Sequence, residues 1–282
     1  MFDASFPTWV NGALCEPGEG FVPVDDVGLL SGLGVFDGLI FEGGHRFFEE
    51  LHLERFARGA QAIGIDWPLP WDPEFVLDEY CRALGERDAF IRLTATRGAP
   101  GRGPTVVVGA REISRPSAAG VRLQLIEASR PSGALAAVKS TSRIGYTLAR
   151  EKARDADAYD ALLVTSGGEV LEGTICNVFV VQARRLITPA IERGCLPGVV
   201  RALVLQEAEG LGLRAEERRV DLADLACADE VLITNTSCGV AGVVEVVGLG
   251  RGELLPGPVG PRTMSLAGAM RAREALDRAR LK

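Results

Sequence analysis

The chain has 282 residues, 47% of them hydrophobic and 24% charged, so one large or two smaller globular domains are expected and disordered, collagen-like and coiled-coil classes are excluded. A net charge of −7 without a basic stripe argues against a nucleic-acid partner. No apolar run approaches the ~20 residues that span a bilayer, and residues 1–12 do not resemble a secretory signal, so neither a membrane nor export is expected.

Strands and helices alternate in the first 115 residues. A helix is predicted where Leu53, Phe56 and Ala60 are spaced to form one buried face. The elements predicted in this part of the chain are strands on both sides of the turn-rich residues 11–20, extended chain over 41–48 around a Gly43-Gly44 turn, helices over 50–63 and 74–84, strands over 88–96 and 105–110, and a loop over 97–104.

The second half also mixes helices and strands. Gly167-Gly168 is a strong hairpin signal, and residues 116–120 have the composition of a connection between domains. The predicted elements are strands over 121–126, 160–165, 169–181, 213–220, 229–235 and 239–247, and helices over 145–156, 199–210 and 258–279. The pattern predicts an α/β or α+β fold with a smaller domain over residues 1–117 and a larger one over 118–282.

The cysteines show no metal or disulfide pattern. They stand at positions 15, 81, 176, 195, 227 and 238 without a CxxC pair, and the chain has only two histidines. This spacing is typical neither of a zinc site nor of a compact disulfide framework. Reduced thiols in the cytoplasm, and no resident metal, are therefore expected.

Lysine is rare in this chain. It occurs only at positions 139, 152 and 282, and the other 28 of the 31 basic residues are arginine. Because arginine keeps its proton, it cannot replace a lysine that acts as an amine nucleophile. Lys152 lies in a charged helical stretch and Lys282 is the last residue, whereas Lys139 follows the apolar and small residues 133–138. Lys139 is therefore a candidate nucleophile, the alternative being a half-buried strand lysine with a solvated amine.

Three separated places offer groups that bind phosphate. Pro197 and Gly198 begin a predicted helix, where free N–H groups and the helix dipole favour an anion. The turn over residues 234–237 presents hydroxyls and amides, and Arg55 supplies a positive charge. Taken singly, each place also fits a plain alternative: an uncapped helix start, a polar turn, a solvated arginine.

Glu172 lies in a run of apolar and small residues, over 170–179. A carboxylate buried in a sheet needs a partner, because burying it alone is costly. The alternative is a strand residue that faces outward.

Gly32 and Gly34 begin a partial dinucleotide fingerprint. The motif ends at Asp37 instead of a third glycine, and the residues before it are a poor strand. A nicotinamide enzyme is therefore not favoured.

Several further motifs follow one another in a specific order and spacing. They are Gly34-Val35-Phe36-Asp37-Gly38, His52-Leu53-Glu54-Arg55, Lys139 ahead of its helix, Val170-Leu171-Glu172-Gly173 with Asn177-Val178-Phe179, Leu196-Pro197-Gly198-Val199-Val200-Arg201, and Asp229-Glu230 with Thr234-Asn235-Thr236. In these motifs the chain resembles the fold type IV pyridoxal-phosphate enzymes: branched-chain and D-amino-acid aminotransferases, (R)-selective amine transaminases and aminodeoxychorismate lyase. The resemblance implies a pyridoxal 5'-phosphate cofactor, a small α/β domain, a larger domain of barrel-like antiparallel strands, and a homodimer with the site between domains.

The resemblance also assigns roles to matching residues. It implies that Lys139 forms the Schiff base with the cofactor aldehyde and then shuttles a proton between substrate Cα and cofactor C4′. Glu172 matches the carboxylate that keeps the pyridine nitrogen protonated, so that the ring acts as an electron sink. The implied phosphate ligands are Arg55, the backbone N–H groups of Val199 and Val200, and the side chain of Thr236.

Substrate contacts are implied at Phe36, Arg102, Ser237 and Cys238. In D-amino-acid aminotransferases and the lyase, the loop that matches residues 97–104 brings an arginine to the substrate carboxylate, which a bidentate guanidinium suits. Arg97 is the alternative to Arg102. The chain departs from the family at Pro104, where some D-amino-acid enzymes have histidine, and near Ser31, where branched-chain enzymes have tyrosine.

Two activities and one other class follow as hypotheses. Amino-group transfer between an amino acid or amine and a 2-oxo acid comes first, because residues 34–38 are similar to a transaminase. The alternative is aminodeoxychorismate lyase, which eliminates pyruvate and gives 4-aminobenzoate, because residues 139–143 and the Arg-Gly pairs at 97–98 and 102–103 are close to segments of that enzyme. The remote alternative is a non-catalytic nucleotide-binding α/β protein.

Overall fold

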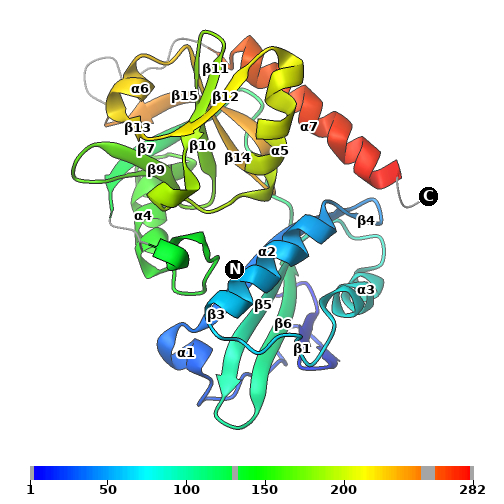
Figure 1. Cartoon of the computed structure of the whole chain (residues 1–282). Coiled ribbons are helices and arrows are strands. Elements are labelled where there is room, and N and C mark those ends of the chain that lie inside the picture. Colours follow the sequence, from blue (N-terminus) through cyan, green and yellow to red (C-terminus); the bar gives the residue numbers. More distant parts are fainter. Residues whose placement is uncertain (1–2, 129–132, 249–257, 280–282) are drawn as a thin grey trace. The chain divides into compact units, whose positions relative to one another are not determined.

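The computed structural model describes residues 3–128, 133–248 and 258–279, and contacts divide it into two compact units (Figure 1). The first unit runs to Ser114 and includes Val138–Ser142 and the last helical turn from Asp277, while the second holds Arg115–Ala137 and Arg143–Leu276. The division into a smaller domain over residues 1–117 and a larger one over 118–282 stays a prediction. Among the helices of the three described ranges, none combines the length and apolar character of a membrane span.

The first unit is built on a six-stranded sheet in which every neighbouring pair is antiparallel. Its strands are β1 (Thr8–Val10), β2 (Ala13–Cys15), β3 (Gly34–Glu42), β4 (His45–Arg46), β5 (Ala89–Ala99) and β6 (Gly103–Arg111), in the order β2-β1-β6-β5-β3-β4. In β5, Ile91 and Leu93 are buried, while the alternating residues Arg92 and Thr94 are half-buried. This alternation directs one face of the sheet into the hydrophobic core.

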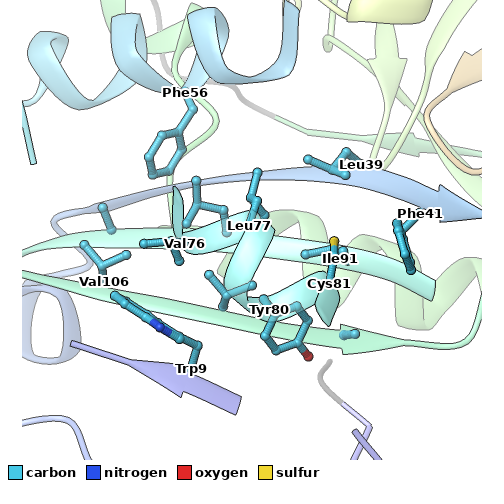
Figure 2. Packing of buried hydrophobic residues seen from close by; sticks show 14 of the residues in the cluster. Trp9, Leu39, Phe41, Phe56, Val76, Leu77, Tyr80, Cys81, Ile91 and Val106 are labelled. Atoms are coloured by element: carbon cyan, nitrogen blue, oxygen red, sulfur yellow. The ribbon is translucent and has the colours of Figure 1, made fainter. Parts of the chain in front are cut away.

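Two helices bury their apolar sides against this face. They are α2 (Glu49–Ala62) and α3 (Pro73–Leu84), preceded by the short α1 (Val27–Ser31). The side chain of Asp72 caps α3 by accepting hydrogen bonds from two backbone N–H groups, and Pro73 occupies the first turn. Figure 2 shows Phe56 of α2 and Leu77 of α3 in the same core as Ile91 of β5.

The second unit is built on a nine-stranded mixed sheet. Its strands are β7 (Val121–Glu127), β8 (Asp160–Val164), β9 (Glu169–Gly173), β10 (Asn177–Gln182), β11 (Arg185–Pro189), β12 (Arg214–Arg218), β13 (Val220–Asp221), β14 (Glu230–Asn235) and β15 (Gly239–Val247), in the order β12-β11-β10-β14-β15-β7-β8-β9-β13. Five neighbouring pairs are antiparallel, but β11–β12, β15–β7 and β7–β8 are parallel. The expectation of antiparallel strands is therefore wrong for these three pairs of the described sheet.

Crossover helices explain two of the parallel pairs. The helices of this unit are η1 (Gly133–Ala137), α4 (Ile144–Asp155), η2 (Ile191–Arg193), α5 (Val199–Ala208), η3 (Glu209–Leu211), α6 (Leu222–Ala226) and α7 (Pro261–Ala279), whose last turn counts with the first unit. The chain passes through α4 between β7 and β8, and through α5 between β11 and β12. Parallel neighbours need such a crossover, because a tight turn joins only antiparallel strands.

Three local predictions differ from the structure. The run 169–181 is not one strand, because a bend over 174–176 separates β9 from β10; there the buried carboxylate of Asp160 accepts hydrogen bonds from the Thr174 hydroxyl and the Ile175 backbone N–H. Strand β2 lies inside the expected turn 11–20, and much of the expected loop 97–104 belongs to β5 and β6. Strand β11 was not predicted. The predicted helices over 50–63, 74–84, 145–156, 199–210 and 258–279 are confirmed with shifted ends.

Two glycines of the β5–β6 hairpin lead to a prediction about stability. Gly98 and Gly101 have φ of +78° and +75°, but a Cβ at Gly98 would overlap the Gly103 carbonyl oxygen, whereas one at Gly101 would meet nothing within 4 Å. Alanine at either site carries a left-handed penalty of about 1–2 kcal/mol, and Gly98→Ala adds a clash worth about 1–3 kcal/mol. Urea unfolding should show the larger loss for Gly98→Ala. Equal losses would contradict this account.

Candidate active site

Lys139 is held at the edge of the first unit's sheet by backbone hydrogen bonds. Its carbonyl accepts from the Phe36 N–H at 2.9 Å, Ser140 forms an antiparallel bridge with Val35, and the Thr141 N–H donates to the Gly34 carbonyl at 2.8 Å. The Lys139 side chain is half-buried. Lys152 is exposed on α4, and Lys282 lies outside the described residues. Lys139 is therefore the described lysine that has a partly desolvated, strand-like setting.

Phe36 lies beside this lysine. Its side chain is buried, and the Lys139 Nζ lies 4.9 Å from the centre of its ring. The Arg92 guanidinium lies 3.7 Å from the same ring centre, and its Nε donates to the Thr94 hydroxyl. Two basic side chains thus contact one aromatic ring, each at a cation–π distance.

Arg55 is buried and paired in the first unit, so it is not a solvated arginine. Its Nε donates to Asp37 Oδ2 at 2.8 Å and its Nη2 to Asp37 Oδ1 at 2.6 Å. The imidazole of His52, which is 1% exposed, donates from Nδ1 to Asp37 Oδ1 at 2.8 Å. A bidentate pair fixes the plane of a guanidinium. Asp37, which in the sequence is only the break in a glycine motif, therefore orients Arg55.

The charges of this cluster follow from its burial. Burial alone would raise the pKa of Asp37, but the Arg55 guanidinium and the His52 hydrogen bond hold that pKa well below its usual range. Burial lowers the pKa of His52, Asp37 opposes this shift, and the charges of Arg55 and Lys139 add to it. At neutral pH the cluster is therefore a direct ion pair between Asp37 and Arg55, with the neutral His52 imidazole bonded to Asp37.

Glu172 is a buried carboxylate with fixed partners in the second unit. It lies on β9 with 5% of its surface exposed. Its Oε2 accepts from the Leu196 backbone N–H at 2.8 Å and from Asn177 Nδ2 at 3.1 Å, and the Tyr146 hydroxyl lies 3.5 Å from its Oε1. The outward-facing alternative is therefore wrong. Asn177, like Asp37, was not predicted as a site residue.

The helix that follows Gly198 presents an open N-terminus. Val199 and Val200 form the first turn of α5, and Gly198 at the N-cap provides no side-chain hydrogen bond to that turn. The buried Arg201 guanidinium donates to the Pro189 carbonyl and pairs with Glu217. The backbone N–H groups at the start of α5 therefore have no side-chain cap from Gly198, and the anion site expected there stays a prediction.

The turn after β14 is organised by one side chain. Asn235 Oδ1 accepts from the backbone N–H groups of Ser237 and Cys238 at 2.9 and 2.8 Å, and Thr236, Ser237 and Cys238 are half-buried. Burial raises the pKa of the Cys238 thiol to about 12, so the thiol is protonated at neutral pH. The turn therefore presents neutral hydroxyl and thiol groups.

The two loop arginines lie on the β5–β6 hairpin. Arg97 is exposed in β5 and Arg102 is exposed at the tip, where its backbone N–H donates to the Ala99 carbonyl at 3.0 Å. Of the residues expected from the sequence, the first unit therefore holds Phe36, Arg55, Arg102 and Lys139, and the second holds Glu172, Val199, Val200, Thr236, Ser237 and Cys238.

Comparison with known proteins gives one family. The family described as Amino-transferase class IV matches residues 34–246. A putative branched-chain-amino-acid aminotransferase of Methanocaldococcus jannaschii is 34% identical over 85% of this chain and 88% of its own length. A D-alanine aminotransferase of Bacillus licheniformis is 31% identical over 88% of this chain and 91% of its own, and an aminodeoxychorismate lyase of Bacillus subtilis is 27% identical over 81% and 82%.

Solved structures have the same fold. The branched-chain aminotransferase of Thermoproteus uzoniensis, crystallised with norvaline, superposes with a TM-score of 0.83 at 28% identity, and the match covers 94% of this chain and 93% of that one. A hypothetical aminotransferase from Mycobacterium tuberculosis in its PLP-bound form superposes with a TM-score of 0.81 at 22% identity, over 96% and 99%. The two-unit α/β architecture is thus that of this family.

His52 predicts a pH dependence of stability. Because burial lowers the pKa of His52 in the folded state, the unfolded chain takes up the proton first as the pH falls below about 6.5. Below that pH the free energy of unfolding decreases by up to about 1.4 kcal/mol per pH unit. His52→Asn keeps an N–H donor for Asp37 but cannot titrate. Its free energy of unfolding should fall less between pH 7.5 and 5.5 than that of the unsubstituted chain. If urea unfolding gives the same pH dependence of the free energy of unfolding for His52→Asn and for the unsubstituted chain, the prediction is wrong.

Proposed function

The chain belongs to the class IV aminotransferases, a family of pyridoxal-phosphate enzymes, and from that premise we propose that it moves an amino group between an amino acid or amine and a 2-oxo acid. The observation that carries the proposal is Glu172, a buried carboxylate with one oxygen fixed by two N–H donors. Such a carboxylate is suited to hold a proton on a ring nitrogen. Helix α5 begins at Val199, three residues after Leu196, and its N-cap Gly198 provides no side-chain hydrogen bond.

The residues of the candidate active site fit pyridoxal 5'-phosphate by their chemistry. When bound, this cofactor supplies an aldehyde for amines and a ring that withdraws electrons. The groups we assign to its phosphate are Arg55, the backbone N–H groups of Val199 and Val200, and the Thr236 hydroxyl. These supply a guanidinium, a helix N-terminus and a hydroxyl, which together favour a dianion.

Lys139 carries the proposed chemistry. With the cofactor bound, its amine would bond the cofactor aldehyde and, once a substrate amine has displaced it, would move a proton at the substrate Cα. The Phe36 ring at 4.9 Å from Nζ limits where the amine can go. Glu172 would keep the pyridine nitrogen protonated. The ring would then withdraw electrons more strongly and favour removal of the proton from the substrate Cα.

Substrate recognition is proposed for four residues. Arg102 offers a bidentate guanidinium to a carboxylate, while Phe36, Ser237 and Cys238 supply an aromatic ring, a hydroxyl and a protonated thiol. Because Arg102 is at the exposed tip of the hairpin, it has room to move toward a ligand. We also propose a cytoplasmic homodimer, whose oligomeric state size-exclusion chromatography with light scattering would test.

A lyase is the second candidate. The relative of this type, from Bacillus subtilis, is 27% identical. Residues 139–143 are similar in sequence to a segment of that enzyme and include Arg143. The Arg143 guanidinium lies 4.4 Å from the Tyr146 ring centre and donates a hydrogen bond to the Thr174 carbonyl. A fixed cation near Glu172 suits an acidic substrate such as aminodeoxychorismate.

Substrate assays separate the candidates. Purified protein with pyridoxal phosphate should transfer amino groups from a panel of L- and D-amino acids and amines to 2-oxoglutarate or pyruvate. Pyruvate release from aminodeoxychorismate without a 2-oxo acid acceptor would instead identify the lyase. A protein that stays colourless with added pyridoxal phosphate would refute both and favour the non-catalytic class.

Lys139 gives the sharpest test of the site. Borohydride reduction and proteolysis should place the pyridoxyl label on Lys139. Lys139→Arg keeps the charge but cannot bond the aldehyde, so turnover should fall by more than about a thousandfold while the melting temperature stays within a few degrees. Lys152→Arg, on the exposed face of α4, is the matched control and should keep full activity. Label on Lys152 together with an active Lys139→Arg would overturn the assignment.

A further inference from the structure

Asn177 joins two elements of the second unit that the proposed function assigns to opposite ends of one cofactor. It begins β10, and its side chain is buried at 6% exposure. Nδ2 donates to Glu172 Oε2 at 3.1 Å and to the Leu196 carbonyl at 2.9 Å. An amide NH2 group has two N–H donors, so these two bonds use both.

The loop before α5 completes a closed set of hydrogen bonds. The Leu196 N–H donates to Glu172 Oε2 at 2.8 Å, the same oxygen that Asn177 reaches. Glu172, Asn177 and Leu196 are therefore each bonded to the other two. Because these bonds include a charged acceptor and are buried, removing Asn177 leaves groups unsatisfied and costs more than an exposed bond would.

The other side of the Asn177 amide fixes the chain at the helix start. Gly198, the N-cap of α5, packs so closely that a Cβ there would overlap Asn177 Oδ1. Asn177 thus contacts the loop at Leu196 through one hydrogen bond and at Gly198 through packing. A glycine at 198 is required by this contact and not by its backbone angles, since its φ is −67°.

We infer that Asn177 is a positioning residue that sets the Glu172 carboxylate relative to the N-terminus of α5. The inference rests on the proposed function, in which Glu172 serves the ring nitrogen and α5 serves the phosphate. A rigid cofactor gains from both contacts at once only if their spacing is fixed. Asn177 therefore acts through Glu172 and the helix start, without touching the reacting atoms.

Binding of the cofactor and of one analogue to the cofactor-free protein tests this inference. The probes are pyridoxal phosphate and 1-deaza-pyridoxal phosphate, in which carbon replaces the ring nitrogen that Glu172 serves. Asn177→Leu should raise the dissociation constant of pyridoxal phosphate by at least about tenfold, as expected for losing a buried bond to a charged group. The loss should be several-fold smaller for the deaza analogue, because that ligand makes no ring-nitrogen contact to lose.

A purely structural role for Asn177 would give a different result. It would weaken both ligands by the same factor, and that outcome overturns the inference, as does an unchanged dissociation constant for pyridoxal phosphate. Asn177→Ala removes the N–H donors without placing a second carboxyl beside Glu172, so it should show the same difference between ligands if Asn177→Leu fails to fold.

Two controls separate this inference from the proposed function. Gln182→Leu removes another amide of β10, which donates to the Asp224 carbonyl at 3.2 Å, and should change neither dissociation constant. Failure of the unsubstituted chain to bind pyridoxal phosphate overturns the proposed function and this inference with it. Tight binding by that chain, with equal losses for both ligands in the Asn177 variants, overturns the inference alone.

Discussion

Backbone pairing between β3 and residues 139–141 is the interaction on which the candidate site depends. Lys139 belongs to no helix or strand of its own, so its place is set by hydrogen bonds that it and its neighbours make to Gly34 and Phe36. The approach is so close that a Cβ at position 34 would lie 2.9 Å from the Thr141 hydroxyl. Glycine at the start of β3 is therefore a steric condition for placing the lysine beside Phe36.

Both units use a buried carboxylate together with a second polar residue. In the first unit, Asp37 holds the Arg55 guanidinium through two hydrogen bonds. In the second, Asn177 and the Leu196 N–H hold Glu172. Charged groups that are buried in this way cannot swing to solvent, so each presents a fixed direction to a ligand. The cost of burying charge is offset by contacts within the same unit.

The helices were predictable because their signal is local, and the strand order was not. Leu53 and Phe56 show the helical period directly, and the scarcity of lysine isolated Lys139 without any alignment. The break between β9 and β10 depends on Asp160 of a neighbouring strand, which bonds to Thr174. Likewise, Asn177 and Asp37 gain meaning only from partners distant in the chain. The resemblance located Glu172 and Arg55, but only the three-dimensional contacts show what orients them.

The insertion of residues 139–141 into the first sheet has a consequence for synthesis. The chain leaves the ribosome from its N-terminus, so β3 is complete long before its edge partner emerges. Until then, the N–H and C=O groups of Gly34–Phe36 on that edge have no strand beside them, and an open edge is a template for pairing with other chains. Asp277, which accepts a hydrogen bond from the Phe48 N–H, arrives later still. The nascent first unit thus remains unfinished until nearly the whole chain has been made, which favours late, concerted folding and a need for protection of that edge.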